Sequence, residues 1–133
     1  MKERKKIKIM LVEDEAGILK MEKEALSSLG VTIIEASSGV EAIKKLAHEK
    51  PDVLFLDLIL PDMTGESIVR FVKSSESLKD VSVIVVTAKE DAETIERCYR
   101  SGCDGYITKP INPEAFVEKA ILALSEKGID LEE

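Results

Sequence analysis

The chain has little of what thiol and imidazole metal chemistry needs. Its 133 residues include one histidine, His48, and two cysteines, Cys98 and Cys103. The cysteines are five positions apart and far from His48, which matches no zinc-binding spacing. A chain of this length can bury a core without disulfides, so we expect two reduced structural thiols and a surface histidine.

Long apolar runs are also missing. No run approaches the roughly 18 to 20 residues that span a bilayer. The N-terminus begins Met-Lys-Glu-Arg-Lys-Lys and lacks the apolar stretch of a signal peptide. These absences predict a cytoplasmic protein that makes no membrane contact.

Charge is unevenly distributed along the chain. The net charge is -7, yet residues 1–8 carry five basic groups and one acid, which leaves 14 minus 25, or -11, for the remainder. An acidic body repels phosphate backbones, so we expect no direct nucleic-acid binding. With 44% hydrophobic and 34% charged residues, the chain is typical of one globular domain. We assign residues 1–6 to a basic tail, 7–126 to the domain and 127–133 to a C-terminal tail.

Short apolar runs predict the strands. Three nearly unbroken runs are typical of strands buried on both faces of a parallel sheet, and two weaker runs of edge strands. The runs are residues 7–12, 53–56 and 81–86, and residues 31–36 and 105–108. Helical periodicity separates them; in the first helix, Ile18, Met21, Ala25 and Leu29 form the expected buried face.

The order of these elements predicts the fold class. Local signals agree with it, because Ser38 precedes the second helix and Asn112-Pro113 begins the last. Alternating strands and helices with short connections favour an α/β fold, a five-stranded parallel sheet with helices on both faces. If the strand order is 2-1-3-4-5, ligands bind where the order reverses, beyond the carboxyl ends of the strands.

Polar residues stand at those carboxyl ends. Glu13 and Asp14 follow the first strand and Asp57 the third, so their carboxylates are expected to converge. Two carboxylates about 4 Å apart repel by roughly 4 kcal/mol at an effective dielectric constant of about 20. A cation offsets this repulsion, and an all-oxygen cluster suits Mg²⁺ or Mn²⁺. Thr87 and Lys109 end the fourth and fifth strands, where a hydroxyl and an ammonium group can hold a phosphoryl group.

Each of these residues also has a purely structural interpretation. Asp14 or Glu15 could cap the first helix, Asp57 could begin a turn, Thr87 could cap the fourth helix, and Lys109 could be a surface lysine. Five such residues at four strand ends are difficult to explain by capping alone. We therefore favour a functional site.

Four stretches of the sequence resemble the receiver domain of two-component response regulators, including chemotaxis receivers, over about residues 7–126. They lie at residues 9–15 (IMLVEDE), 51–65 (PDVLFLDLILPDMTG), 83–88 (VIVVTA) and 102–110 (GCDGYITKP). The resemblance implies a (βα)5 flavodoxin-like fold and a switch activated by phosphorylation. It implies no enzymatic activity beyond the domain's own phosphorylation and autodephosphorylation.

The resemblance also implies a role for each site residue. Asp57 would accept the phosphoryl group from a phosphohistidine on a sensor kinase or phosphotransfer protein. Asp14, Asp57 and the backbone carbonyl of Ile59 would ligate Mg²⁺, with Glu13 acting mainly through water. The remaining phosphoryl contacts would come from Lys109, Thr87 and the amide of Ala88.

A conformational switch is implied as well. Thr87 would move toward the phosphoryl group and Tyr106 would turn inward, which changes the surface of the fourth helix, fifth strand and fifth helix. An unidentified downstream protein or output domain would read that surface. The family typically has a cis peptide bond at Lys109-Pro110.

Rival interpretations fit less well. A haloacid-dehalogenase-type phosphatase needs a second aspartate at the position of Ile59. An FMN carrier would need a phosphate loop in place of the acidic residues 13–15. A degenerate receiver that serves as a phosphorylation-independent protein-binding scaffold remains the alternative.

Overall fold

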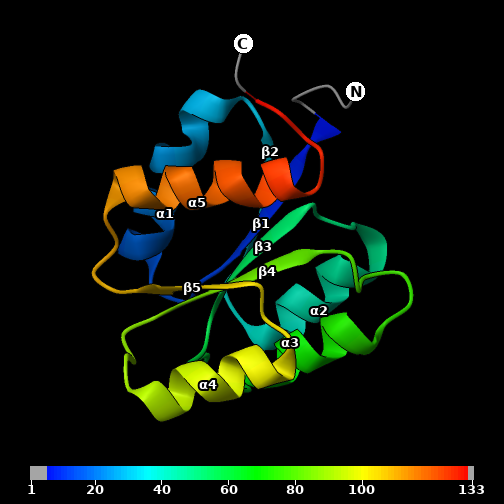
Figure 1. Ribbon diagram of the computed structural model, residues 1–133, viewed down its shortest axis with the longest axis vertical. Coiled ribbons are helices and arrows are strands. Elements are labelled where there is room, and N and C mark those ends of the chain that lie inside the picture. The colour runs from blue at the N-terminus through cyan, green and yellow to red at the C-terminus, as the bar shows by residue number, and fades with distance from the viewer. Residues whose placement is uncertain (1–5, 132–133) are drawn as a thin grey trace.

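The computed structural model describes residues 6–131, which form a parallel sheet between two layers of helices (Figure 1). The sheet order is β2-β1-β3-β4-β5, as predicted. Each expected strand is present, with its ends shifted by at most one residue. The strands are β1 (Lys8–Val12), β2 (Thr32–Ala36), β3 (Val53–Asp57), β4 (Ser82–Thr87) and β5 (Gly105–Thr108).

The helices divide unequally between the two faces of the sheet. α1 and α5 cover one face, and α2, α3 and α4 cover the other (Figure 1). Their bounds are α1 (Ala16–Leu26), α2 (Gly39–His48), α3 (Gly65–Ser74), α4 (Ala92–Ser101) and α5 (Pro113–Glu126), with a short 3-10 helix, η2 (Ser27–Leu29), after α1. Within residues 6–131, no helix combines the length and hydropathy that a bilayer crossing requires.

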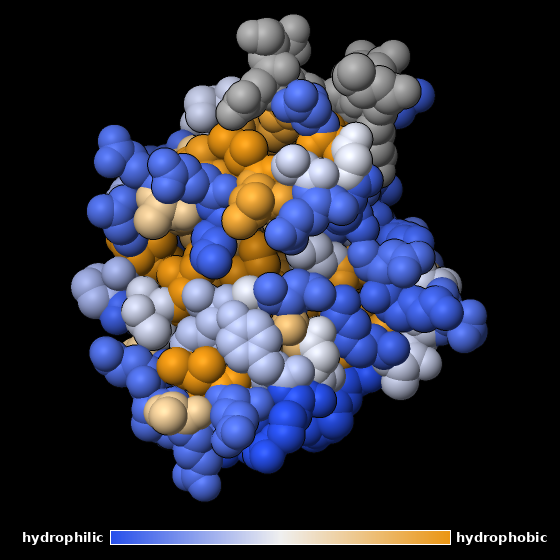
Figure 2. All heavy atoms as spheres, viewed as in Figure 1, coloured by the Kyte–Doolittle hydropathy of each residue, from blue (hydrophilic) through white to orange (hydrophobic). Residues whose placement is uncertain are grey.

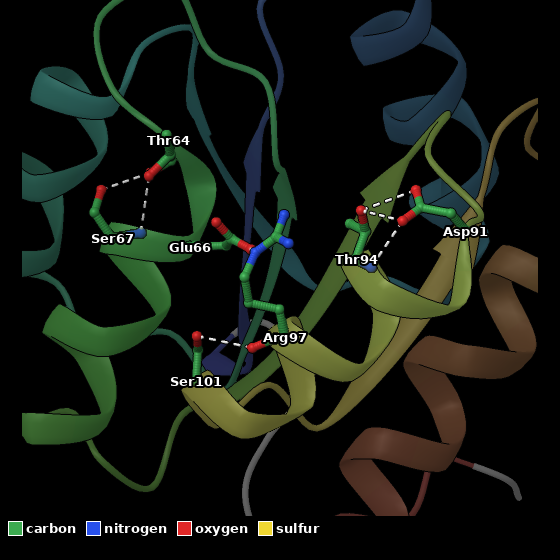
Figure 3. Close-up of polar contacts among 7 residues, drawn as sticks. All are labelled: Thr64, Glu66, Ser67, Asp91, Thr94, Arg97 and Ser101. Carbon is green, nitrogen blue, oxygen red and sulfur yellow. Dashed lines mark hydrogen bonds and ion pairs between the residues drawn. The ribbon is translucent and has the colours of Figure 1, made fainter.

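Side-chain caps define where four of the helices begin. Ser38 and Asn112 cap α2 and α5 as the sequence predicts, each accepting a hydrogen bond from a backbone amide three residues later. Thr64 and Asp91 do the same for α3 and α4 (Figure 3). These bonds satisfy amides that a helix leaves without partners in its first turn.

Two apolar clusters fill the space between the layers. The three central strands are buried along almost their whole length, as their unbroken apolar runs predict. One cluster joins the sheet to α2, α3 and α4, and the other joins it to α1 and α5. Leu131 is buried in the second cluster, so packed structure continues into the segment expected to be a C-terminal tail. Residues 1–5 of the expected basic tail, and residues 132 and 133, lie outside the described part of the chain.

The expected buried face of the first helix was right only at Leu29, which is buried but lies in η2 after α1. Ile18, Met21 and Ala25 are half-buried, whereas Glu22 and Leu26 are fully buried. The helix is rotated from the predicted face because Leu26 packs in the cluster shared with α5. Because Glu22 is a charged residue type in the middle of the buried face, apolar periodicity does not predict that face.

Candidate functional site

The carboxyl ends of β1 and β3 bring three acidic residues together. The two strands are hydrogen-bonded neighbours, with Val12 opposite Leu56. Glu13, Asp14 and Asp57 therefore converge, and each offers an oxygen within 4.8 Å of the others. Glu13 and Asp57 are buried, whereas Asp14 is exposed at the rim. The sequence-based expectation of an acidic cluster at this edge is met.

Lys109 supplies a positive charge to this cluster from the other side. Its ammonium nitrogen lies 3.0 Å from Oδ2 of Asp57 and 3.1 Å from Oε1 of Glu13. The lysine side chain is 13% exposed, so it is not the surface lysine of the alternative interpretation. The Lys109–Pro110 peptide bond is cis.

Burial and charge shift the proton affinities in opposite ways. Burial raises the pKa of the Glu13 carboxyl, and the nearby Asp57 carboxylate raises it further, while the hydrogen bond from Lys109 partly lowers it. Burial alone would lower the pKa of Lys109, but its hydrogen bonds to Asp57 and Glu13 reverse that effect and raise it. Lys109 therefore stays cationic, and the remaining negative charge is left for another cation to neutralise.

The backbone around Asp57 is constrained by a hydrogen bond and by close packing against α3. Oδ1 of Asp57 accepts a hydrogen bond from the amide of Ile59 at 3.0 Å, so the turn interpretation of Asp57 holds alongside the cluster. The start of α3 presses against the same segment. A Cβ at Gly65 would lie 2.4 Å from the carbonyl oxygen of Asp57, closer than side chains approach a backbone oxygen. The matched sequence stretch contains this glycine, but its steric role is visible only in three dimensions.

Thr87 ends β4 beside the acidic cluster and is completely buried. It does not cap α4, because that helix begins at Ala92 and Asp91 is its cap. The hydroxyl oxygen of Thr87 accepts a hydrogen bond from the amide of Lys89 at 3.4 Å. Ala88 and Ile59 are exposed at the mouth of the site, and Ile59 is 58% exposed.

Tyr106 of β5 is linked to the same loop as Thr87. Its hydroxyl donates a hydrogen bond to the carbonyl of Lys89, and its ring packs against the cluster shared with α2 and α3. Burial raises the pKa of Tyr106 to about 12. Thr87 and Tyr106 thus both contact the backbone of Lys89, which connects the end of β4 to the middle of β5.

The helix after this loop is tied to its neighbour by an ion pair. Arg97 of α4 and Glu66 of α3 point toward each other and form a hydrogen-bonded pair (Figure 3). The pair links α4 to α3, which begins immediately beside the Asp57 segment. Neither residue was singled out by the sequence, because charged residues far apart in the chain carry no pairing signal.

Some residues lie away from the site or were missed. His48 is exposed at the end of α2, and both cysteines are free and buried, as expected. Glu15 reaches within 4.0 Å of the Lys109 ammonium group, although sequence reasoning considered it only as a cap. It stands at the N-cap position of α1, where its side chain makes no capping hydrogen bond.

The geometry defines what the site can do. Carboxylate oxygens suit a hard divalent cation. An ammonium group and a hydroxyl at the adjacent strand ends suit an anionic group bound next to that cation.

The comparison with known proteins agrees, because the sequence model described as "Response regulator receiver domain" matches residues 9–121. The chain belongs to this receiver family.

Relatives of this receiver support the assignment in sequence and in structure. The polar-differentiation response regulator DivK of Brucella ovis is 33% identical over 110 residues, which cover 83% of this chain and 89% of that protein. A CheY-like receiver domain protein from Methanospirillum hungatei has a TM-score of 0.86 at 28% identity, covering 92% of this chain and 97% of that one. The receiver domain of DrrB, activated with BeF3, has a TM-score of 0.83 at 31% identity, covering 90% of this chain and 98% of that one.

Family membership sets the general function. Receiver domains are signalling modules of two-component systems and act as phosphorylation-activated switches. They interact with histidine kinases or phosphotransfer proteins and with output partners. The chain is therefore a receiver domain of a two-component response regulator.

Proposed function

We propose that this receiver accepts a phosphoryl group on Asp57 from a phosphohistidine of a sensor kinase or a histidine phosphotransfer protein. One observation carries the proposal. The buried Asp57 carboxylate has one oxygen on the Lys109 ammonium group and the other on the Ile59 amide, next to Glu13 and Asp14. Two hydrogen-bond donors hold the Asp57 carboxylate in place. It can accept a phosphoryl group once a cation offsets the negative charge of Glu13 and Asp14.

Mg²⁺, or Mn²⁺ in its place, fits the donor set. Asp14 and Asp57 would hold the ion directly, with the carbonyl of Ile59 as a backbone ligand and Glu13 acting through water. The raised pKa of Glu13 and the crowding of three carboxylates support the need for a cation there. When bound, the ion neutralises charge on the transferred phosphoryl oxygens.

The transfer itself needs positioning more than acid-base chemistry. An oxygen of Asp57 attacks the phosphorus, the P–O bond of an acyl phosphate forms, and the P–N bond of the phosphohistidine breaks. The departing ring nitrogen keeps the electron pair, and the proton on the other ring nitrogen leaves the histidine neutral. Lys109, the Thr87 hydroxyl and the Ala88 amide hold the phosphoryl oxygens. Water later attacks the phosphorus, releases inorganic phosphate and restores Asp57.

The output follows from the loop that Thr87 and Tyr106 share. Phosphorylation adds about -1.5 to -2 charges and three strong acceptors, which draw the Thr87 hydroxyl away from the Lys89 amide. Tyr106, whose hydroxyl is hydrogen-bonded to the carbonyl of Lys89, then turns inward. This movement changes the surface of α4, β5 and α5. This surface controls a downstream protein or output domain. Figure 2 shows apolar side chains gathered over the α5 side of this face. Leu122 of α5 is 53% exposed.

The proposed unit is the domain spanning residues 7–126, with residues 1–6 and 127–133 as flanking segments. It acts on no substrate besides its own phosphoryl group. The alternative is a scaffold that binds its partner without phosphorylation. The two differ in whether Asp57 takes up a phosphoryl group at all.

Acetyl phosphate with Mg²⁺, followed by intact mass spectrometry, decides between them. We expect one added phosphoryl group in the wild type and none in Asp57→Asn. Asp80→Asn is the matched control, because Asp80 is exposed and precedes β4 at the opposite edge of the sheet. Its mass shift should equal that of the wild type. An unmodified wild type that still folds would favour the scaffold.

A further inference from the structure

One buried carboxyl has no part in the proposed transfer. Glu22 lies in the middle of α1 and is 2% exposed. Its Oε1 is buried without a hydrogen-bond partner among the described residues. Buried acidic side chains are normally paired, because desolvating an ionised carboxylate is costly. Glu22 therefore needs an explanation that packing alone does not give.

Apolar residues of α1 flank Glu22 on the face that is packed against the sheet. One turn of the helix on either side of it, Leu26 belongs to the cluster that joins α1 to the sheet, and the partly buried Leu19 packs against that cluster. α5 contributes Phe116 and Ala120 to the same cluster. A charge placed there would have little to solvate it, so the packed cluster favours the neutral carboxylic acid.

The charges that act on Glu22 belong to the acidic site. Side chains on a helix lean toward its N-terminus, and the N-terminus of α1 follows directly from Glu13 and Asp14 at the carboxyl edge of the sheet. Burial, and then the charges of Glu13 and Asp57, raise the pKa of Glu22 to about 8 against the opposing effect of Lys109. Each of these groups comes from a different strand end: Glu13 from β1, Asp57 from β3 and Lys109 from β5.

We propose that Glu22 couples proton concentration to cation affinity at the acidic site of this receiver. The carboxyl is neutral in the packed domain around neutral pH and ionises in mildly alkaline solution. Ionised Glu22 adds a negative charge that interacts with Glu13 and Asp57, and this charge strengthens the attraction for Mg²⁺. This inference rests on the proposed function, since it assumes that the site holds a divalent cation.

Linkage makes the effect reciprocal. If ionisation of Glu22 tightens Mg²⁺ binding by some factor, Mg²⁺ binding must increase the acid dissociation constant of Glu22 by the same factor. Glu13 also gains or loses protons near the site, but that contribution is present whether or not residue 22 titrates. A comparison with Glu22→Gln, which keeps the shape and cannot ionise, isolates the part that belongs to Glu22.

The first measurement needs no metal. Carbon-13 NMR of glutamate-labelled wild-type protein follows each side-chain carboxyl against pH, and Glu22→Gln serves to assign the resonance. We expect Glu22 to titrate with a midpoint well above that of the exposed glutamates. A midpoint in the ordinary glutamate range would overturn the inference.

The second measurement is Mg²⁺ affinity, followed by amide NMR at about pH 6 and about pH 9. We expect the wild type to gain affinity over Glu22→Gln at the higher pH by about fivefold or more, the range of ordinary linked sites, and to match it at the lower pH. Glu24→Gln, at an exposed position of the same helix, should behave as the wild type. The same pH dependence in all three proteins would overturn the inference alone. Failure of all three to bind Mg²⁺ at either pH would overturn the proposed function as well.

Discussion

Lys109 and Asp57 are 52 positions apart in the chain, yet their charged groups lie 3.0 Å apart at the carboxyl edge of the sheet. The same ammonium group reaches Glu13 at 3.1 Å. One lysine therefore offsets part of the charge of two buried carboxylates. Under the proposed function, cation binding and phosphoryl transfer would use the same few atoms that affect the stability of the fold.

Replacing this lysine should destabilise the domain in a pH-dependent way. Lys109→Met leaves Glu13 and Asp57 without their cation, and we expect a loss of about 1 to 3 kcal/mol at pH 8 in a metal-free buffer. The pKa of Glu13 is already raised, so its protonation at lower pH relieves the repulsion and the loss shrinks near pH 5. Urea denaturation at both pH values measures this. Lys20→Met, at an exposed position of α1, is the control, and equal losses at both pH values would contradict the prediction.

Removing one charge from the cluster should have the opposite effect on the metal-free protein. Asp14→Asn lowers the repulsion, so we expect a gain of about 0.5 to 1 kcal/mol without Mg²⁺, which is modest because Asp14 is exposed. Mg²⁺ should then stabilise the variant less than the wild type. Thermal unfolding with and without Mg²⁺ tests both parts. A lower melting temperature of the variant in EDTA would count against the repulsion argument.

The close approach of Gly65 to the Asp57 backbone predicts a steric effect. Gly65→Ala places a Cβ 2.4 Å from a carbonyl oxygen, so α3 or the Asp57 segment must shift, and we expect a loss of about 2 kcal/mol or more. Phosphorylation by acetyl phosphate should slow as well. Gly17→Ala is the matched control, because the added Cβ meets no atom within 4 Å beyond its chain neighbours and the adjacent backbone of its own helix. It should be neutral or slightly stabilising. Similar unfolding curves for the two variants would refute the steric role.

The buried Glu22 should lower the free energy of unfolding, and replacing it with an apolar residue should raise it. Its pKa of about 8 in the folded protein lies above the ordinary value of 4.5, so the folded state binds more protons than the unfolded state between these two values. The stability of the wild type therefore falls across that window as pH rises, by up to about 1.4 kcal/mol per pH unit for one full proton. Glu22→Leu removes this slope. Urea denaturation from about pH 5 to 8.5 should show the variant gaining most over the wild type at the alkaline end, and parallel curves would disprove this.

Much of the fold could be predicted because its signals are local. Unbroken apolar runs mark β1, β3 and β4, since strands buried on both faces tolerate few polar residues. The caps at Ser38 and Asn112 are likewise local, since each side chain bonds to an amide three residues away. α1 is the exception. Its buried face includes Glu22, and no pattern of apolar residues indicates a core position occupied by a carboxyl.

The sequence by itself determined which residues end the strands, and the rule that parallel strands share one carboxyl edge brought Glu13, Asp14, Asp57, Thr87 and Lys109 to a common site. Only the tertiary structure decided the distances: Lys109 on both carboxylates, Gly65 against the backbone of Asp57, and Arg97 paired with Glu66. These contacts join residues from separate elements, and their geometry depends on how helices pack on the sheet. Side-chain burial and pairing are properties of that packing, and a linear pattern does not encode them.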